Sequence, residues 1–149
     1  MLLGMSPYLP PPIETATDPV YSAADMCQRW RALMGPLGFG ERLLWLGFVG
    51  ADRRMYKTLS QVPIRPRPKR WFVEDVVSRL RFVVDNFEEG ATVALLLTRP
   101  GPGPISHLDR QWSTLLTEVA AEFGVPLEPI FRANDESLVL VEPELERAS

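Results

Sequence analysis

The stretch from Ala91 to Asp109 constrains the fold of this chain more than any other part of its sequence. It begins as a largely apolar segment, continues through a rigid turn of alternating proline and glycine, and ends in Ser-x-x-Asp. An apolar run predicts a buried strand, and Ser-x-x-Asp is typical of the first turn of a helix. Because ligands in open α/β sheets bind beyond the carboxyl ends of strands, this turn is the first candidate for a functional site.

Apolar periodicity places the other elements in a simple order. It predicts a helix capped at Ser22 and two more over 72–87 and 106–123, with strands at 41–49, 54–62, 127–132 and 137–141 around the central strand that starts at 91. Strand 41–49 is apolar on both faces, so both faces of the sheet should be covered. A strand–helix–strand link favours parallel pairing, and hairpins add antiparallel pairs. We therefore predict an α/β fold, a mixed sheet of roughly five strands with about three helices.

Three parts are expected along the chain. Residues 1–19 are rich in proline and small residues and have no apolar period, which favours a flexible leader. Residues 20–142 should form a single α/β domain, because a chain of this length suits one core. Residues 143–149 form an acidic tail.

Composition and charge bound the classes of function. The net charge is −3, so nothing overall favours nucleic acid or an anionic membrane surface. The apolar runs are too short to span a bilayer, and the N-terminal region has no Lys or Arg before Arg29, unlike a signal peptide. The single cysteine, Cys27, excludes an internal disulfide and is expected to be a small buried hydrophobe. These features predict a cytoplasmic protein with no membrane partner.

The order of elements resembles the JAB/MPN domain, a metallopeptidase-like family of cytidine-deaminase-like architecture, and especially its RadC-like bacterial branch. The resemblance spans Pro19 to Val141 and rests on Glu41 at the first strand, Gly101 in the turn, and Ser106 and Asp109 at the helix start. It implies that an aspartate and a His-x-His pair hold zinc, that the glutamate is a general base, and that the serine assists the oxyanion. By position, Asp109, Glu41 and Ser106 match these roles.

The two histidine positions of the resemblance fall on Leu96 and Thr98. Neither side chain is a zinc ligand, and a catalytic zinc needs about three protein ligands. The resemblance therefore implies a degenerate site without metal or other cofactor. Glu41, Ser106 and Asp109 remain as its candidate residues.

Each of these residues also has a purely structural interpretation. Ser106 and Asp109 suit a capping box, and Glu41 suits a solvated position or a pair with Arg99 or Arg42. His107, one residue into the helix, is expected to point to solvent. The Pro/Gly turn is a poor phosphate cradle, because its prolines lack the backbone N–H groups that a cradle uses.

A second candidate is the basic loop that precedes the long helix. It contains three prolines, which exclude a central strand or a helix, and it carries Arg65, Arg67, Lys69, Arg70 and Trp71. A charge run of this kind is either a solvated loop or a site for a phosphate backbone or an acidic partner.

Three functions stay open at this point. The first is a non-catalytic domain that contacts an unidentified protein partner, a second copy of this chain included. The second is a divergent metal-dependent peptidase or isopeptidase that uses Glu41, Ser106 and Asp109, with Mg²⁺ or Mn²⁺ as the harder ions such oxygens hold. The third is a DNA-associated accessory protein that uses the basic loop at 65–71. Tightly bound zinc would argue against the first, and failure of the three side chains to converge would argue against the second.

Overall fold

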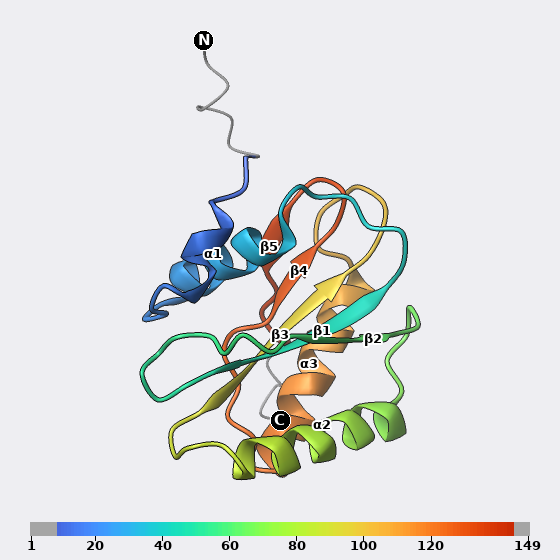
Figure 1. Ribbon diagram of the computed structural model, residues 1–149. Helices are drawn as coiled ribbons and strands as arrows, with labels where there is room; N and C mark the ends of the chain where they lie inside the picture. The colour runs from blue at the N-terminus through green and yellow to red at the C-terminus, as the bar shows by residue number, and fades with distance from the viewer. Residues whose placement is uncertain (1–8, 145–149) are drawn as a thin grey trace.

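In the computed structural model, which describes residues 9–144, one mixed five-stranded sheet carries helices on both faces (Figure 1). The elements are η2 (Ile13–Thr17), α1 (Ala23–Met34), β1 (Leu43–Val49), β2 (Ser60–Pro63), α2 (Arg70–Asp85), β3 (Thr92–Thr98), α3 (His107–Glu122), β4 (Phe131–Ala133) and β5 (Leu138–Leu140). Their order along the chain and the α/β class agree with the sequence-based prediction.

The strands lie in the order β2-β1-β3-β4-β5. β1 runs antiparallel to both β2 and β3, β3 runs parallel to β4, and β5 closes the sheet antiparallel to β4. The expected parallel neighbours are therefore found for the link through α3. For the link through α2 the two strands also run parallel, but the expected pairing is wrong, because β1 lies between β2 and β3.

Two apolar layers cover the two faces of the sheet. On one face, Leu44 and Phe48 of β1 pack with α2 and α3, and on the other face Val49 packs with α1. Strand β3 alternates in the same way, with Leu95 facing α2 and α3 and Leu96 facing α1. The expectation that strand 41–49 is covered on both faces is thus confirmed.

The returning strand is shorter than the span of 54–62 expected from the sequence. Val49 pairs with Met55, whereas Leu46 pairs with Ser60, so the returning segment has more residues than β1 between these two pairs. The surplus forces the exposed Lys57 and Thr58 out of the ladder, as in a bulge. Only Ser60–Pro63 forms the regular strand.

The remaining boundaries move by a few residues. Helix α2 is shifted two residues toward the N-terminus from the predicted span of 72–87. Strand β4 overlaps only the end of the predicted strand 127–132, and β5 lies inside the predicted strand 137–141. Leu127, expected in a strand, forms only an isolated bridge with Val93. The cap at Ser22 is present, since its hydroxyl accepts from the Asp25 amide.

The ends of the chain differ from the expected three-part division at one point. η2 lies within the segment expected to be a flexible leader, and Ala16 and Val20 are buried, so the folded part begins before residue 20. Of the expected acidic tail, residues 145–149 lie outside the described part of the chain, as do residues 1–8 of the leader. Within residues 9–144, no helix combines the length and the apolar character needed to cross a bilayer.

Candidate functional site

Asp109 lies at the centre of a polar network where β3 and β4 end. The Ser106 hydroxyl accepts from the Asp109 amide at 3.1 Å, and the Asp109 carboxylate accepts from the Ser106 amide at 2.9 Å. This is the capping box that the sequence predicts, and it is confirmed. It fixes the Asp109 carboxylate at the first turn of α3, where the positive end of the helix dipole also favours it.

Two arginines bind the same carboxylate. Arg99 donates from Nε to Oδ1 and from Nη2 to Oδ2, both at 2.9 Å, and Arg132 donates from Nε to Oδ2 at 3.3 Å. Arg132 is fully buried. It pairs with Leu97 in the sheet, and strand alternation therefore turns it toward the face that α3 covers. The bidentate pair between Arg99 and Asp109 belongs to the stronger class of hydrogen-bonded ion pairs in proteins.

The protonation of this network follows from its contacts. Burial alone would raise the pKa of Asp109, but the hydrogen bonds from Arg99 and the Ser106 amide, with the charges of Arg99 and Arg132, hold it below its ordinary value. Burial, with the charge of Arg99, lowers the pKa of Arg132 despite the attraction of Asp109. Asp109 is therefore an ionised structural anion at neutral pH and is poorly suited to exchange a proton.

The Pro/Gly turn is held by the β4–β5 hairpin. The Gly101 amide donates to Asp135 Oδ2 at 2.9 Å, and the Gly103 amide donates to Glu136 Oε1 at 2.8 Å. Asn134 Nδ2 donates to the Gly103 carbonyl at 2.8 Å. Both glycines have positive φ values, which favour glycine. The two amides that a bound phosphate would need are thus already engaged by carboxylates.

The residues present do not fit the zinc that the JAB/MPN resemblance implies. Leu96 is buried in the apolar layer beneath α1, and Thr98 Oγ1 accepts from Trp45 Nε1 at 3.0 Å. Asp109 begins the helix that covers the opposite face, and both its oxygens bind guanidinium groups. Within the described range, no three His, Cys, Asp or Glu side chains come together as a metal-binding group.

The other candidate residues of this region lie apart from the network. Glu41 is exposed two residues before β1, and among the described residues it forms no hydrogen bond or ion pair with Ser106 or Asp109. Arg99, one of the partners considered for Glu41, binds Asp109 instead. His107 is exposed, as expected, with Nδ1 at 4.0 Å from Glu144. Cys27 is half-buried, and burial raises its thiol pKa against the opposing charge of Arg31, which does not suit a nucleophile.

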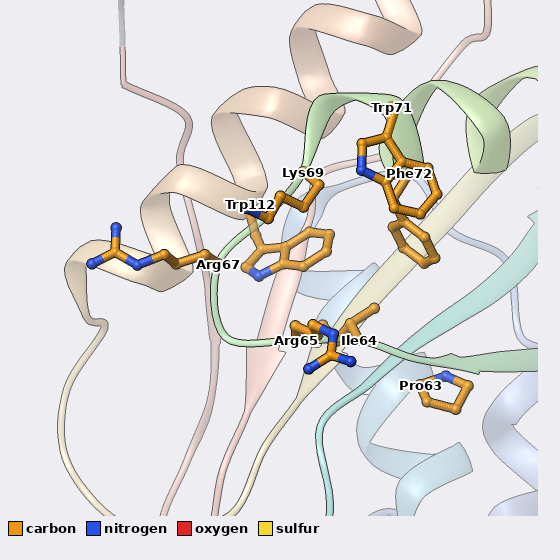
Figure 2. A pocket seen from close by; sticks show the side chains of 8 residues that line it. All are labelled: Pro63, Ile64, Arg65, Arg67, Lys69, Trp71, Phe72 and Trp112. Atoms are coloured by element: carbon orange, nitrogen blue, oxygen red, sulfur yellow. The ribbon is translucent and has the colours of Figure 1, made fainter.

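The basic loop forms a cavity of about 140 Å³ with the start of α2 and with Trp112 of α3 (Figure 2). We call it the basic–aromatic cavity; its lining residues are Pro63, Ile64, Arg65, Arg67, Lys69, Trp71, Phe72 and Trp112. Trp112 Nε1 donates to the Pro66 carbonyl at 3.0 Å, and the rings of Phe72 and Trp112 meet edge to face at 6.3 Å. These contacts hold the loop over α3.

The cavity presents positive charge and an exposed aromatic ring to solvent. Arg65, Arg67 and Lys69 are exposed and form no ion pair with any residue of the described chain. Arg70, the fourth cation expected at this site, is instead paired with Glu74 at 3.1 Å and Glu122 at 2.7 Å. Trp71 is 70% exposed. Three of the four cations are therefore available to a ligand.

Helix α2 adds to the positive character of this cavity. Its N-cap residue, Lys69, makes no capping hydrogen bond through its side chain, and its first turn contains no acidic residue. The N–H groups of an uncapped first turn carry partial positive charge. Helix α3, in contrast, has its first turn satisfied by Ser106 and Asp109.

Comparison with known protein families, with characterised proteins and with solved structures finds no match to this chain. The network around Asp109 is closed and hydrogen-bonded within the protein, whereas the basic–aromatic cavity is open and carries unpaired cations. The second region is the better candidate for a functional site.

The indole N–H of Trp112 should hold the basic loop in place. We expect Trp112→Phe to keep the aromatic floor, to lower the free energy of unfolding by about 1 kcal/mol, and to speed amide hydrogen exchange at residues 65–69. Trp45→Phe is the matched control, because it removes the indole bond to Thr98 on the other face of the sheet. Loop exchange that is equal in the two variants would show that the Trp112–Pro66 bond does not order the loop.

Proposed function

We propose that this protein is a non-catalytic binding domain that contacts a protein partner through the basic–aromatic cavity. The observation that carries the proposal is the set of unpaired cations, Arg65, Arg67 and Lys69, around an open aromatic cavity. These side chains add little to the stability of the fold, because the Trp71 ring is exposed to water and the three cations form no ion pair with a described residue. An exposed aromatic ring beside such cations is typical of a binding surface.

The partner that fits this cavity is an acidic protein segment with one apolar side chain. A cavity of about 140 Å³ matches the size of a single ring or branched side chain, since an engineered cavity of about 150 Å³ holds benzene. Carboxylates beside that side chain would face Arg65 and Lys69, and the uncapped start of α2 favours negative charge as well. We therefore place an apolar anchor in the cavity and carboxylates at its rim.

A catalytic role has weaker support. Both oxygens of Asp109 are bound by arginines, and Glu41 lies apart from Ser106 and Asp109. In this proposal the RadC-like resemblance concerns the scaffold alone, since the positions of its metal ligands do not converge: Leu96 faces α1, whereas Asp109 begins the helix on the opposite face. Mass-spectrometric metal analysis of the purified, untagged protein should find less than stoichiometric zinc, and one tightly bound zinc per chain would contradict the proposal.

A role in binding DNA is less well supported than a protein contact. Nucleic-acid affinity comes mostly from several phosphate contacts spread along a basic surface. Among the residues that the structure describes, the cations at the cavity without an ion pair are only Arg65, Arg67 and Lys69, and the adjoining surface carries Glu118 and Glu144. A phosphate backbone that left the cavity along α3 would meet these carboxylates.

The four tryptophans of the chain allow a direct test. We expect the acetylated peptide Glu-Glu-Leu-Glu-Glu to shift the indole N–H resonances of Trp71 and Trp112 in two-dimensional NMR. Trp30 of α1 is fully buried against the sheet and serves as the internal control whose resonance should not move. The peptide with glutamine in place of each glutamate should shift neither cavity indole. A larger effect of single-stranded oligothymidine than of the acidic peptide would favour the nucleic-acid alternative instead.

Charge removal at the cavity should weaken this binding. We expect Arg65→Gln with Lys69→Gln to lower the affinity for the acidic peptide about fivefold, because each exposed charge contributes modestly. Lys57→Gln with Arg79→Gln makes the same change of net charge elsewhere and should leave the affinity unchanged. Equal loss in both double variants would mean that only the overall charge matters, and the cavity would lose its assigned role.

A further inference from the structure

A second cavity of about 390 Å³ adjoins the basic–aromatic cavity, and the two share Arg67 and Lys69. The second cavity runs along α3 from His107, beside Glu144, past Gln111, Thr114 and Leu115 to Glu118. In Figure 2 the Arg67 side chain extends away from the Trp112 ring, while Lys69 lies over the Trp112 side of the site. These two cations therefore stand between the cavities.

The lining of the second cavity changes from positive charge at Arg67 and Lys69 to negative charge along α3. Gln111, Thr114 and Glu118 are spaced by three and four residues, so they lie on one face of α3. Glu118 is exposed and forms no ion pair with another described residue, and the exposed Glu144 carboxylate lies 4.0 Å from the exposed His107. The wall of the second cavity thus carries two carboxylates, Glu144 near the start of α3 and Glu118 about three turns further along it, and neither forms an ion pair with an Arg or Lys of the described chain.

From these observations we infer that the two cavities form one docking groove for an extended protein segment of defined charge order. The segment places an apolar side chain with neighbouring carboxylates in the basic–aromatic cavity and a basic side chain at Glu118, on a wall to which Glu144 adds negative charge. Charge complementarity at both ends argues for this occupant. The inference deepens the proposed function and rests on it.

The geometry of α3 sets the spacing of the two anchors. Gln111, next to Trp112 in the sequence, and Glu118 are seven positions apart on one face of α3, which is about 10 Å along the helix axis. An extended chain covers that length with about three residues. The structure therefore assigns the basic side chain of the partner to the third position from the apolar anchor. Thr114 and Gln111 lie between as hydrogen-bonding groups, with Leu115 as the apolar part of the floor.

The test uses two probe peptides and their reversed sequences on the full chain. The first probe is acetylated Glu-Glu-Leu-Ser-Ser-Lys, and the second carries Gln in place of Lys. We expect the wild-type protein to bind the Lys probe about threefold more tightly than the Gln probe in one chain direction, as measured by titration of the Trp71 indole resonance. In Glu118→Gln with Glu144→Gln this preference should disappear. The preference should also fall at high salt, because both carboxylates are exposed.

A matched control and the possible outcomes separate this inference from the proposed function. Glu14→Gln with Glu89→Gln removes the same charge from exposed sites and should keep the threefold preference. If both probes shift Trp71 equally in both chain directions, the groove inference fails while the proposed function stands. If neither probe shifts Trp71, the proposed function fails and this inference fails with it. A preference that survives in Glu118→Gln with Glu144→Gln would also overturn the assigned basic end.

Discussion

Replacing Asp109 with Asn is expected to lower the free energy of unfolding by about 3–5 kcal/mol, because it removes the anion from a buried ion-pair network. Asparagine keeps the size of the side chain, and its amide oxygen can still accept from the Ser106 amide. It cannot neutralise Arg132, which is fully buried, or hold Arg99 in a bidentate pair. A domain of ordinary stability has only about 5–15 kcal/mol to lose, so this variant should be near the limit of folding.

Urea unfolding followed by tryptophan fluorescence measures this loss. Asp75→Asn is the matched control: Asp75 also pairs with an arginine, Arg79, but both side chains are largely exposed, and its loss should cost about 0.5 kcal/mol or less. Similar unfolding midpoints for the two variants would contradict the structural importance of the network. An Asp109→Asn protein as stable as the wild type would do the same.

The same pair of proteins should show a pH dependence of known sign. The pKa of Asp109 lies below its ordinary value in the folded state, so its contribution is present above the unfolded pKa, about 3.9. That contribution is lost as the pH falls through the folded pKa. We therefore expect the stability difference between wild type and Asp109→Asn to be constant above about pH 5 and to shrink below about pH 4. A difference that grows on acidification would contradict the assigned ionised state.

Introducing histidines at the two positions that the JAB/MPN resemblance assigns to them is expected to damage the fold without creating a zinc site. Leu96→His with Thr98→His should lower the free energy of unfolding by about 3–5 kcal/mol. Loss of buried leucine surface costs about 1.5–3 kcal/mol, and an unpartnered buried imidazole costs about 1–3 kcal/mol. Thr98→His also removes the acceptor of the Trp45 indole N–H.

The second half of this prediction concerns the metal. Leu96 faces α1, whereas Asp109 opens the helix on the opposite face and already binds two arginines. Zinc per chain should therefore stay well below one in metal analysis of the double variant. Leu96→Met is the control, since a volume-conserving apolar change should cost less than about 1.5 kcal/mol. A folded double variant with one bound zinc would show that the two faces meet more closely than these contacts indicate.

Much of the local structure could be predicted because it depends on neighbours in the sequence. The capping box at Ser106 and Asp109, the cap at Ser22 and the turn Gly50–Arg53 follow from side-chain and backbone preferences within a few residues. The apolar character of both faces of strand 41–49 likewise predicted cover on both sides. The boundaries of β2 were not predictable, because the surplus residues at Lys57 and Thr58 depend on register with β1.

The candidate site was only partly predictable for the same reason. Arg65, Arg67, Lys69 and Trp71 were recognised from the charge and aromatic pattern of the loop. Phe72 and Trp112 were missed as lining residues, because their spacing marks them only as part of apolar helix stripes. No local signal indicates that Trp112 lies under a loop more than forty residues earlier in the chain. Nor does any local signal show that Arg70 would be paired with Glu122 and so withdrawn from the site.

By itself, the sequence determined the class of fold, the order of helices and strands, and the caps that begin α1 and α3, since periodicity and capping are local properties. Only the tertiary structure decided whether the stretch from Ala91 to Asp109 forms an open site or a closed network. Strand order and register turn Arg99 and Arg132 toward Asp109, so the turn becomes a closed ion-pair network. The same packing brings the basic loop over Trp112 and opens the groove beside it. Long-range packing makes these contacts, and no pattern of neighbouring residues encodes them.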